Sequence, residues 1–422
     1  MSRMVAQIVF ECATALKVGS NNRDLLQDSP IQRDWNGLPM ILGTSLAGVL
    51  RKSFPSNIAD AMFGKECGSK VIISNALLVD ENAKVNEGIC LTKSKFLQNF
   101  SILPLREHTT LTHKGVTKEH SKFDEEIVYK GTRFKFRIEM PQNDEKDKEF
   151  FFDMLDTLNT QTFRIGSGGA KGRGEIKIFE ICYDILDDLE YNALSSSLNA
   201  TLKHAYQPKD KEHNYIHYKL TLTPDDFFIF GSGGGDEDAD HIGLSEKIID
   251  YNAKDLTEKK IVIPASSIKG ALSQRTAFYY NQLERCYIED LKDDKELPNL
   301  AVAEIFGTKK DKETESKKGK ILLSDVYWED LRQEDTKVFA HVKIDDFTGG
   351  AVNGALFQEK TNTLQNSFVF NVWLQKGIES HALQAFENAL KDIAKGALPL
   401  GGAVNKGHGF FSGTITKEGE NL

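Results

Sequence analysis

A glycine-rich segment that occurs twice constrains this chain more than any other feature. Residues 165–174 read Ile-Gly-Ser-Gly-Gly-Ala-Lys-Gly-Arg-Gly, and residues 400–409 read Leu-Gly-Gly-Ala-Val-Asn-Lys-Gly-His-Gly. The two segments align without a gap at a distance of 235 positions, and the alignment matches three glycines and the lysine. A tight turn requires only one or two glycines at set places, so this repeated spacing predicts a tandem of two related units.

Glycine-rich loops with nearby cations are typical of anion sites. Glycine reaches positive φ and carries no Cβ, so successive N–H groups can converge on an anion, to which lysine, arginine or histidine adds positive charge. A nucleic-acid backbone or a polyphosphate is the ligand we expect, and a plain turn between two strands is the alternative. The candidate binding residues are Gly166, Ser167, Gly168, Gly169, Lys171 and Arg173 in the first copy and Gly401, Gly402, Asn405, Lys406 and His408 in the second.

Length and composition agree with two domains. A chain of 422 residues is too long for one core and suits two units of about 200 residues. We place the domains at residues 1–195 and 210–422, with the boundary in the polar stretch 192–214. No apolar run is long enough for a membrane span and no signal-peptide pattern is present, so we expect a cytoplasmic protein without a membrane partner.

Charge and cysteine usage narrow the function classes. The five cysteines lie far apart and form no C-x-x-C pair, which favours neither a zinc site nor a disulfide framework. The net charge of −9 argues against indiscriminate nucleic-acid binding. Much of the acid is concentrated in linker-like stretches such as residues 143–147 and 236–240, whereas the glycine loops are locally basic.

The hydrophobic pattern follows the same order in both halves. Residues 4–12 and 215–222 alternate as half-buried strands, and residues 149–158 and 383–393 are amphipathic helices that lead into the glycine loops. Each half reads strand, helix, strand, long hairpin, strand, helix, glycine loop, strand. This order predicts an α+β fold of the βαββαβ kind, in which one antiparallel sheet is backed by two helices.

The starts of the first helices are further candidate sites. Thr44-Ser45 in the first half and Ser266-Ser267 in the second are predicted N-caps, and their helix ends could also offer hydroxyl and N–H groups to a phosphate. In the second half, Phe347 with Thr348 could stack on a base, or Phe347 could be buried under the hairpin. The helix-start candidates are Ser45, Arg51, Ser266, Ser267, Lys269 and Arg275.

These motifs together resemble the RAMP superfamily, the backbone subunits of type III CRISPR effector complexes. Residues 39–51 read Pro-x-x-x-Gly-x-Ser-Leu-x-Gly-x-Leu-Arg, and a glycine-rich loop follows before the last strand. Residues 28–34, Asp-Ser-Pro-Ile-Gln-Arg-Asp, are similar to the segment that precedes this motif in the family. Residues 123–126 with 131–134 in the first half, and residues 344–349 with 354–357 in the second, resemble the strands around the family's thumb hairpin. The likeness covers nearly the whole chain twice, as in a tandem fusion of two RAMP units.

The resemblance implies a fold and an activity. Each unit is expected to have a ferredoxin-like (RRM-like) core with a long thumb hairpin, to hold guide RNA within a filament of other effector subunits, and to cut complementary target RNA with a divalent metal ion, Mg²⁺ or Mn²⁺. The family's cleavage aspartate falls on Asp28, which is also the candidate metal ligand. Asp24 is a nearby rival, and an Asx turn ahead of Pro30 is the structural alternative.

The second half departs from the family pattern. Aligning residues 247–249 with residues 30–32 places Ser245 where Asp28 stands, so a cutting carboxylate would have to come from elsewhere. Asp240 is the candidate, with an acidic surface loop as the alternative. Two other functions stay open from the sequence, namely a scaffold that binds guide RNA without cutting and a stand-alone endoribonuclease that processes guide precursors.

Overall fold

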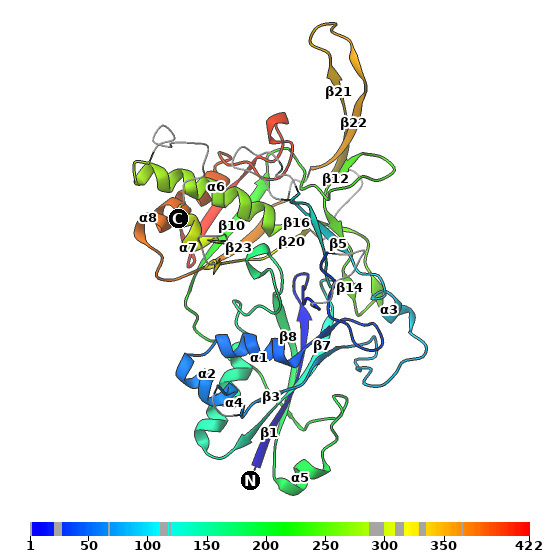
Figure 1. Cartoon of the computed structure of the whole chain (residues 1–422), viewed down its shortest axis with the longest axis vertical. Helices are drawn as coiled ribbons and strands as arrows, with labels where there is room; N and C mark the ends of the chain where they lie inside the picture. The colour runs from blue at the N-terminus through cyan, green and yellow to red at the C-terminus, as the bar shows by residue number, and fades with distance from the viewer. Residues whose placement is uncertain are drawn as a thin grey trace.

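The chain forms two hydrophobic cores, one in each half of the sequence. The computed structural model describes residues 2–20, 28–65, 68–109, 117, 120–286, 299–308, 316–328, 335–363 and 366–422. One core gathers residues from Met4 to Ile181, together with Ile249, and the other gathers residues from Tyr218 to Ile415. Figure 1 shows the two units one above the other, with the N-terminus at the far end of the first.

The first core lies on a largely antiparallel sheet. The strand order is β2-β4-β7-β1-β8-β9, and β3 also pairs with β7. The helices α1, α2 and α4 pack together beside this sheet (Figure 1) and contribute Leu46, Leu50 and Phe151 to its core. The strands are β1 (Ser2–Cys12), β2 (Met40–Ile41), β3 (Ile72–Ile73), β4 (Ala76–Leu78), β7 (Arg133–Gln142), β8 (Ile176–Leu186) and β9 (His204–Ala205); the helices are α1 (Gly43–Lys52), α2 (Ser56–Phe63), α3 (Lys95–Gln98), α4 (Glu145–Leu158) and α5 (Asp188–Ala193).

The second core repeats this arrangement. Its main sheet has the order β19-β23-β10-β24-β25, which matches β3-β7-β1-β8 of the first half, and its pairs are antiparallel. The expected α+β architecture, an antiparallel sheet backed by helices in each half, is therefore confirmed. The elements of this core are β10 (Tyr215–Pro224), β19 (Ile321–Leu323), β23 (Phe368–Gln375), β24 (Phe411–Lys417), β25 (Glu420–Asn421), α6 (Ala265–Leu283), α7 (Leu300–Ile305) and α8 (Ser380–Ala394).

Smaller sheets carry the hairpins. In the first half β5 (Leu105–His108) pairs with β6 (Phe123–Glu126), and in the second half β21 (Thr336–Ile344) pairs with β22 (Ala351–Thr363). The β21–β22 hairpin projects away from the body of the protein in Figure 1. The remaining short strands are β11 (Phe227–Phe228), β12 (His241–Ile242), β13 (Ser245–Glu246), β14 (Ile249–Asp250), β15 (Asp255–Leu256), β16 (Lys260–Ile263), β17 (Gly307–Thr308), β18 (Lys317–Lys318) and β20 (Val326–Trp328).

Helix starts differ from the sequence prediction. α4 begins at Glu145, four residues earlier than predicted, because the side chain of Asp144 accepts a hydrogen bond from the N–H of Asp147. The predicted N-caps at residues 44–45 and 266–267 are wrong: α1 begins at Gly43 and α6 at Ala265, so these residues, Ser45 and Ser267 included, lie inside the first turns. The first N–H of each helix instead binds a side chain from a distant loop, Asn75 for Gly43 (2.9 Å) and Asp325 for Ala265 (2.8 Å).

The two halves meet at an extended junction. The β14–β15 hairpin of the second half docks on the first, where Ile249 joins the first core and its N–H donates to the carbonyl of Lys130 (3.0 Å). The Tyr251 hydroxyl donates to the Val79 carbonyl (2.7 Å). The first glycine loop reaches the second half, since the N–H of Asp325 donates to the carbonyl of Gly172 (3.1 Å).

A buried arginine ties this junction together. Arg106 on β5 donates to Asp325 (2.5 Å), to Glu246 (2.9 Å) and to the hydroxyl of Tyr327 (3.1 Å), all in the second half. Its side chain is 4% exposed. The neighbouring carboxylates of Asp325 and Glu246 raise the pKa of Arg106 well above its ordinary value, against the opposing effect of burial, so the cation is retained inside the junction.

Candidate functional site

The two glycine loops have the same backbone structure. In the first loop, the N–H of Ile165 donates to Gly174 and the N–H of Ser167 donates to Lys17, both at 2.9 Å. In the second loop, Leu400 donates to Gly409 (2.8 Å) and Gly402 to Ile229 (2.7 Å). Short 3-10 turns, Gly169–Lys171 and Val404–Lys406, occupy equivalent places. The repeat that was read from the sequence is therefore a repeat in three dimensions.

Glycine is required in these loops mainly for close backbone approach. Gly166 has φ +78°, and a Cβ there would lie 2.2 Å from the carbonyl oxygen of Lys17. Its counterpart Gly401 has φ +92° and would meet the carbonyl oxygen of Ile229 at 2.4 Å. Since the N–H groups of Ser167, Lys171, Arg173 and Gly174 all donate to carbonyls of the chain, those four groups are not free to converge on an anion.

The loop cations surround a glutamate in each half, which is partly buried in the first half and buried in the second. Arg173 is 1% exposed and lies 2.6 Å from Glu125 on β6, while the His108 ring lies 3.0 Å from the same carboxylate. In the second half, His408 and His341 lie 3.4 Å and 3.6 Å from Glu359 on β22. Each glutamate therefore joins a glycine loop to a hairpin, and this placement of Arg173 and His408 favours a structural role over direct contact with phosphate.

Aromatic contacts complete these two clusters. The ring of His108 stacks on Phe123 with centroids 5.2 Å apart, and the ring of His341 stacks on Phe357 at 5.0 Å. Lys171 lies over Phe123 (5.5 Å) and Lys406 over Phe357 (4.7 Å). The hydrogen bond from His108, followed by the charge of Arg173, lowers the pKa of Glu125 below its ordinary range despite partial burial.

Sequence reasoning missed these glutamate clusters. A signal was present, because Phe-x-Glu occurs at residues 123–125 and again at residues 357–359. The second occurrence begins at the last residue of segment 354–357 and runs past it, so the equivalence becomes visible only from the strand register, which pairs His108 with Phe123 and His341 with Phe357.

The two candidate aspartates occupy equivalent positions. Isolated bridges join Gly19 with Ile31 and Gly231 with Gly243, so the loops between them have the same length. Counted from these bridges, Asp240 stands where Asp28 stands. The alignment that placed Ser245 there is wrong, because Ser245 instead pairs with Ile261 in the strand ladder between β13 and β16.

Both aspartates are exposed and are fixed to the hairpin beside the glutamate clusters. The carboxylate of Asp28 accepts a hydrogen bond from the N–H of Asp124 (3.1 Å), and that of Asp240 accepts one from the N–H of Gln358 (2.8 Å). Asp28 and Asp124 form a reciprocal pair, because the N–H of Asp28 donates to the Asp124 carboxylate at 2.9 Å. The rival Asp24 lies outside the described residues.

The hairpin residue that follows the clustered glutamate anchors each aspartate loop, and the sign of its charge differs between the two halves. Glu126 accepts a hydrogen bond from the N–H of Ile31 (2.9 Å) and pairs with Arg33. Its counterpart Lys360 lies 3.1 Å from Asp236 and 2.7 Å from Asp238. The same strand position therefore holds both loops by different chemistry.

The other candidate residues are dispersed. Arg51 pairs with Asp60 and the carbonyl of Gly64, Lys269 donates to the carbonyl of Phe306 (3.0 Å), and Arg275 donates to the carbonyl of Ala397 (2.8 Å). Phe347 is 98% exposed at the tip of the β21–β22 hairpin, where the Asp345 carboxylate accepts hydrogen bonds from the N–H groups of Phe347 and Thr348. The structure thus excludes burial of Phe347 under the hairpin.

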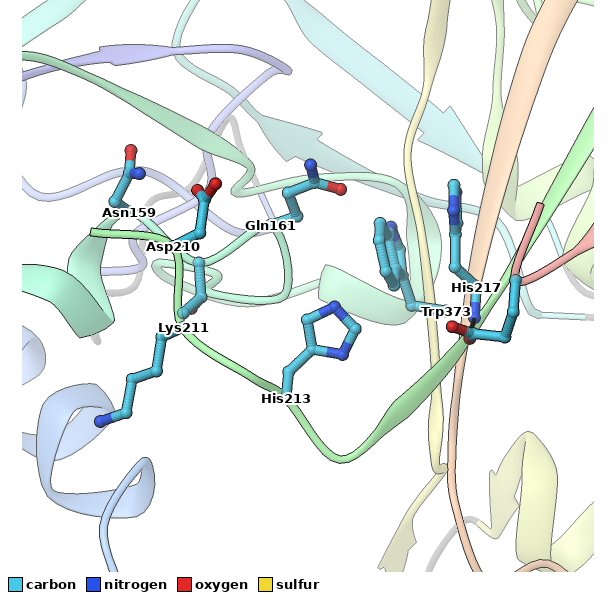
Figure 2. A pocket seen from close by; sticks show the side chains of 9 residues that line it. Asn159, Gln161, Asp210, Lys211, His213, His217 and Trp373 are labelled. Atoms are coloured by element: carbon cyan, nitrogen blue, oxygen red, sulfur yellow. Dashed lines mark hydrogen bonds between the residues drawn. The ribbon is translucent and has the colours of Figure 1, made fainter. Parts of the chain in front are cut away.

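A polar cavity of about 310 Å³ lies between the halves, apart from these clusters. Figure 2 shows His213 from the connecting segment beside the stacked rings of His217 and Trp373. None of the candidate residues from the sequence lines it.

Two further observations concern metals and membranes. Within the part of the chain that the structure describes, no group of three or more histidine, cysteine, aspartate or glutamate side chains is arranged to hold a metal ion. Among the same residues, no helix is both long enough and apolar enough to span a bilayer.

The architecture defines a class, namely proteins built from two tandem α+β units that each carry a hairpin and a glycine loop before the last strand. Comparison with family models identifies the family to which such a protein belongs. The RAMP superfamily model matches residues 9–177 and again residues 222–412, and the chain belongs to that superfamily as a tandem of two units. Members are associated with CRISPR complexes and RNA binding. No curated protein matches the chain.

Proposed function

We propose that this protein is a backbone subunit of a type III CRISPR ribonucleoprotein, which binds guide RNA and cleaves complementary target RNA at Asp28 and Asp240. The main support is the equivalence of the two aspartates: each is exposed and each accepts a hydrogen bond from the same position of its hairpin. This placement is kept although the hairpin residue that anchors each loop is Glu126 in the first half and Lys360 in the second.

The first site suits a divalent cation better than the second. In the reciprocal pair of Asp28 and Asp124, one oxygen of each carboxylate has no hydrogen-bond partner among the described residues. Carboxylate oxygens are the ligands that Mg²⁺ and Mn²⁺ prefer. In the second half Gln358 replaces Asp124, so a neutral amide oxygen accompanies the single carboxylate of Asp240. We therefore expect weaker metal binding at Asp240.

The reaction that fits these groups is transesterification at a ribose. The 2′-hydroxyl oxygen attacks the adjacent phosphorus, the bond from phosphorus to the 5′ oxygen breaks, and a 2′,3′-cyclic phosphate remains. The aspartate accepts the 2′-hydroxyl proton, directly or through a water, and a proton from solvent completes the leaving 5′-hydroxyl. A bound divalent ion supplies charge stabilisation to the phosphorane-like transition state.

The hairpin tip supports an RNA role independently. Phe347 is presented to solvent by a turn that Asp345 fixes. Base stacking is the interaction that such a ring offers to RNA. We therefore assign Phe347 and Thr348 to contact with the guide–target duplex.

Single aspartate variants test the proposal in the assembled complex. Asp28→Ala should abolish one set of cuts in a labelled target RNA and Asp240→Ala another, while the RNA carried by the complex is unchanged. Asp188→Ala, at the exposed start of α5, serves as the matched control. Cleavage that persists at every position in the double variant would identify the chain as a scaffold, and cutting of repeat RNA by the isolated chain would identify it as a processing nuclease.

A further inference from the structure

The cavity in Figure 2 is built by both units and by the segment that links them. Its walls are the turn after α4 in the first unit (residues 159–161), residues 210, 211 and 213 of the linking segment, and three side chains of the second unit, His217, Trp373 and Glu418. A single unit would therefore not form it. Spaces between domains are frequent places for ligands, and this one takes no part in the site described above.

Lys211 lines the cavity but directs its charge away from it. Its ammonium group donates to the carboxylate of Asp153 (2.5 Å) and to the hydroxyl of Thr157 (3.0 Å), both on α4. In Figure 2 this group points away from Trp373. Asp153 is not part of the cavity wall, so the charge of Lys211 is balanced outside it. The other charged groups of the wall are the carboxylates of residues 210 and 418, which disfavours an anionic ligand.

These two carboxylates lie at opposite ends of the cavity. Glu418 belongs to one end, because its carboxylate accepts a hydrogen bond from the N–H of His217 (2.6 Å) and its own N–H donates to the His217 carbonyl (2.9 Å). Figure 2 shows Asp210 on the side away from His217, with Gln161 and His213 between them. Among the described residues no hydrogen bond or ion pair engages the Asp210 carboxylate, and Glu418 keeps one oxygen without a partner. A ligand with a positive group at each end would pair with both.

Aromatic rings line the cavity between its ends. The His217 ring stacks on Trp373 with centroids 4.0 Å apart, and the His213 ring meets Trp373 edge-on at 5.0 Å. Such rings offer apolar surface to methylene groups and attract an ammonium group near their faces. The Nδ1 atom of His213 is buried without a hydrogen-bond partner among the described residues, which is rare for a buried polar atom. A ligand that hydrogen-bonds to this ring would remove the deficit.

The wall from the first unit also favours positive charge. Asn159 and Gln161 contribute side-chain amides to it. Asn159 is the C-cap of α4, and its N–H donates to the carbonyls of Asp156 and Thr157. The carboxyl end of a helix carries partial negative charge. The helix end and the two carboxylates therefore act in the same direction.

We propose that this cavity binds a linear aliphatic diamine or polyamine. One ammonium group pairs with Asp210 and another with Glu418, while the methylene chain lies along the rings of His213 and Trp373. A metal ion fits less well, because no three metal-binding side chains are grouped in the described part of the chain. The inference goes beyond the proposed function and does not depend on RNA binding or cleavage.

Isothermal titration calorimetry on the full chain tests the proposal. The protein is first freed of RNA by nuclease treatment and high salt, since RNA itself attracts polyamines. Putrescine or spermidine should bind at one site per chain. Butylamine, which has the same carbon chain as putrescine but a single charge, should bind at least tenfold more weakly.

Matched variants separate the cavity from general attraction to an acidic protein. Asp210→Asn and Glu418→Gln preserve side-chain size, and each should lower the affinity for putrescine or spermidine at least fivefold. Asp188→Asn at the exposed start of α5 makes the same change in net charge and should leave the affinity unchanged.

The three tryptophans provide a readout of where the ligand lies. With 5-fluorotryptophan incorporated, the diamine should shift the ¹⁹F resonance of Trp373 and leave those of Trp35 and Trp328, which do not line the cavity. The Trp373 resonance is assigned from its loss in Trp373→Phe.

Four results would overturn the proposal. Absence of binding would show that the cavity takes no such ligand, and equal losses in all three acid variants would show diffuse attraction to the net charge of −9. Binding without a shift of the Trp373 resonance would place the ligand elsewhere. Equal affinity for butylamine would show that one cation suffices, as a lysine side chain of a partner would supply.

Discussion

The glycines Gly172 and Gly407 form a matched pair that isolates the contribution of the junction to stability. They occupy the same loop position and have nearly equal backbone angles, with φ +96° and +89°. Changing either to alanine forces a side chain into the left-handed region, which costs about 1–2 kcal/mol. This cost should be common to both variants.

Only one of the variants meets a neighbour. At Gly407 a Cβ would enter open space, whereas at Gly172 it would lie 2.1 Å from the Asp325 carboxylate and 2.7 Å from the Cβ of Ala265. Both neighbours are buried, and Asp325 is bound to Arg106 and to the first N–H of α6. Relief of the overlap must displace this group, and overpacking of this kind costs about 1–3 kcal/mol. We therefore expect Gly172→Ala to be less stable than Gly407→Ala by about 1–3 kcal/mol.

Differential scanning calorimetry on the isolated chain checks this difference. For units of about 200 residues, 1 kcal/mol corresponds to about 2–4 °C in the melting temperature, so the two variants should differ by roughly 2–12 °C. Equal melting temperatures would refute the reasoning, because they would mean that the first glycine loop does not press on Asp325 in solution.

Two further perturbations test the clusters and the junction. Because the pKa of Glu125 is lowered in the folded state, its contribution to stability is present above the ordinary glutamate pKa of about 4.3 and is lost as the pH falls below it. Glu125→Gln should therefore be less stable than the native chain at pH 7 in urea, with a smaller difference at pH 3; a difference that does not change with pH would contradict this. Tyr251→Phe removes the hydroxyl that donates to Val79 and accepts from the N–H of Arg133 (3.1 Å), so it should lower the free energy of unfolding by about 1–3 kcal/mol. An unchanged urea midpoint would show that the β14–β15 hairpin is not fixed at this point.

Local features of the fold were predictable from the sequence, because strand and helix periodicities are properties of neighbouring residues. The duplicated loop and the order of elements follow from such patterns. The antiparallel arrangement of the main sheet in each half follows from them as well. The starts of α1 and α6 were not predictable in this way. Asn75 and Asp325 bind the first N–H groups from loops 32 and 60 positions away, so the nearby serines were the only caps that a local pattern could suggest.

The candidate site was predictable only in part. Asp28 and Asp240 could be singled out from the sequence, but their equivalence required the bridges that fix the two loop lengths. The burial of Arg173 was not predictable for a physical reason. A basic residue in a glycine loop suggests a ligand, and its burial on Glu125 depends on a strand register that the sequence does not display. Arg106 was missed because its partners lie 140 and 219 positions away.

Covalent linkage of the two units has a consequence for how larger assemblies form. Two separate units must find each other at cellular concentrations, whereas tethered units meet at an effective concentration on the order of millimolar. The Arg106 junction therefore closes in every molecule regardless of expression level, in a fixed order and a one-to-one ratio. Any particle that incorporates this protein therefore gains two units with each chain, and the order of those two units within the particle is set by the covalent link.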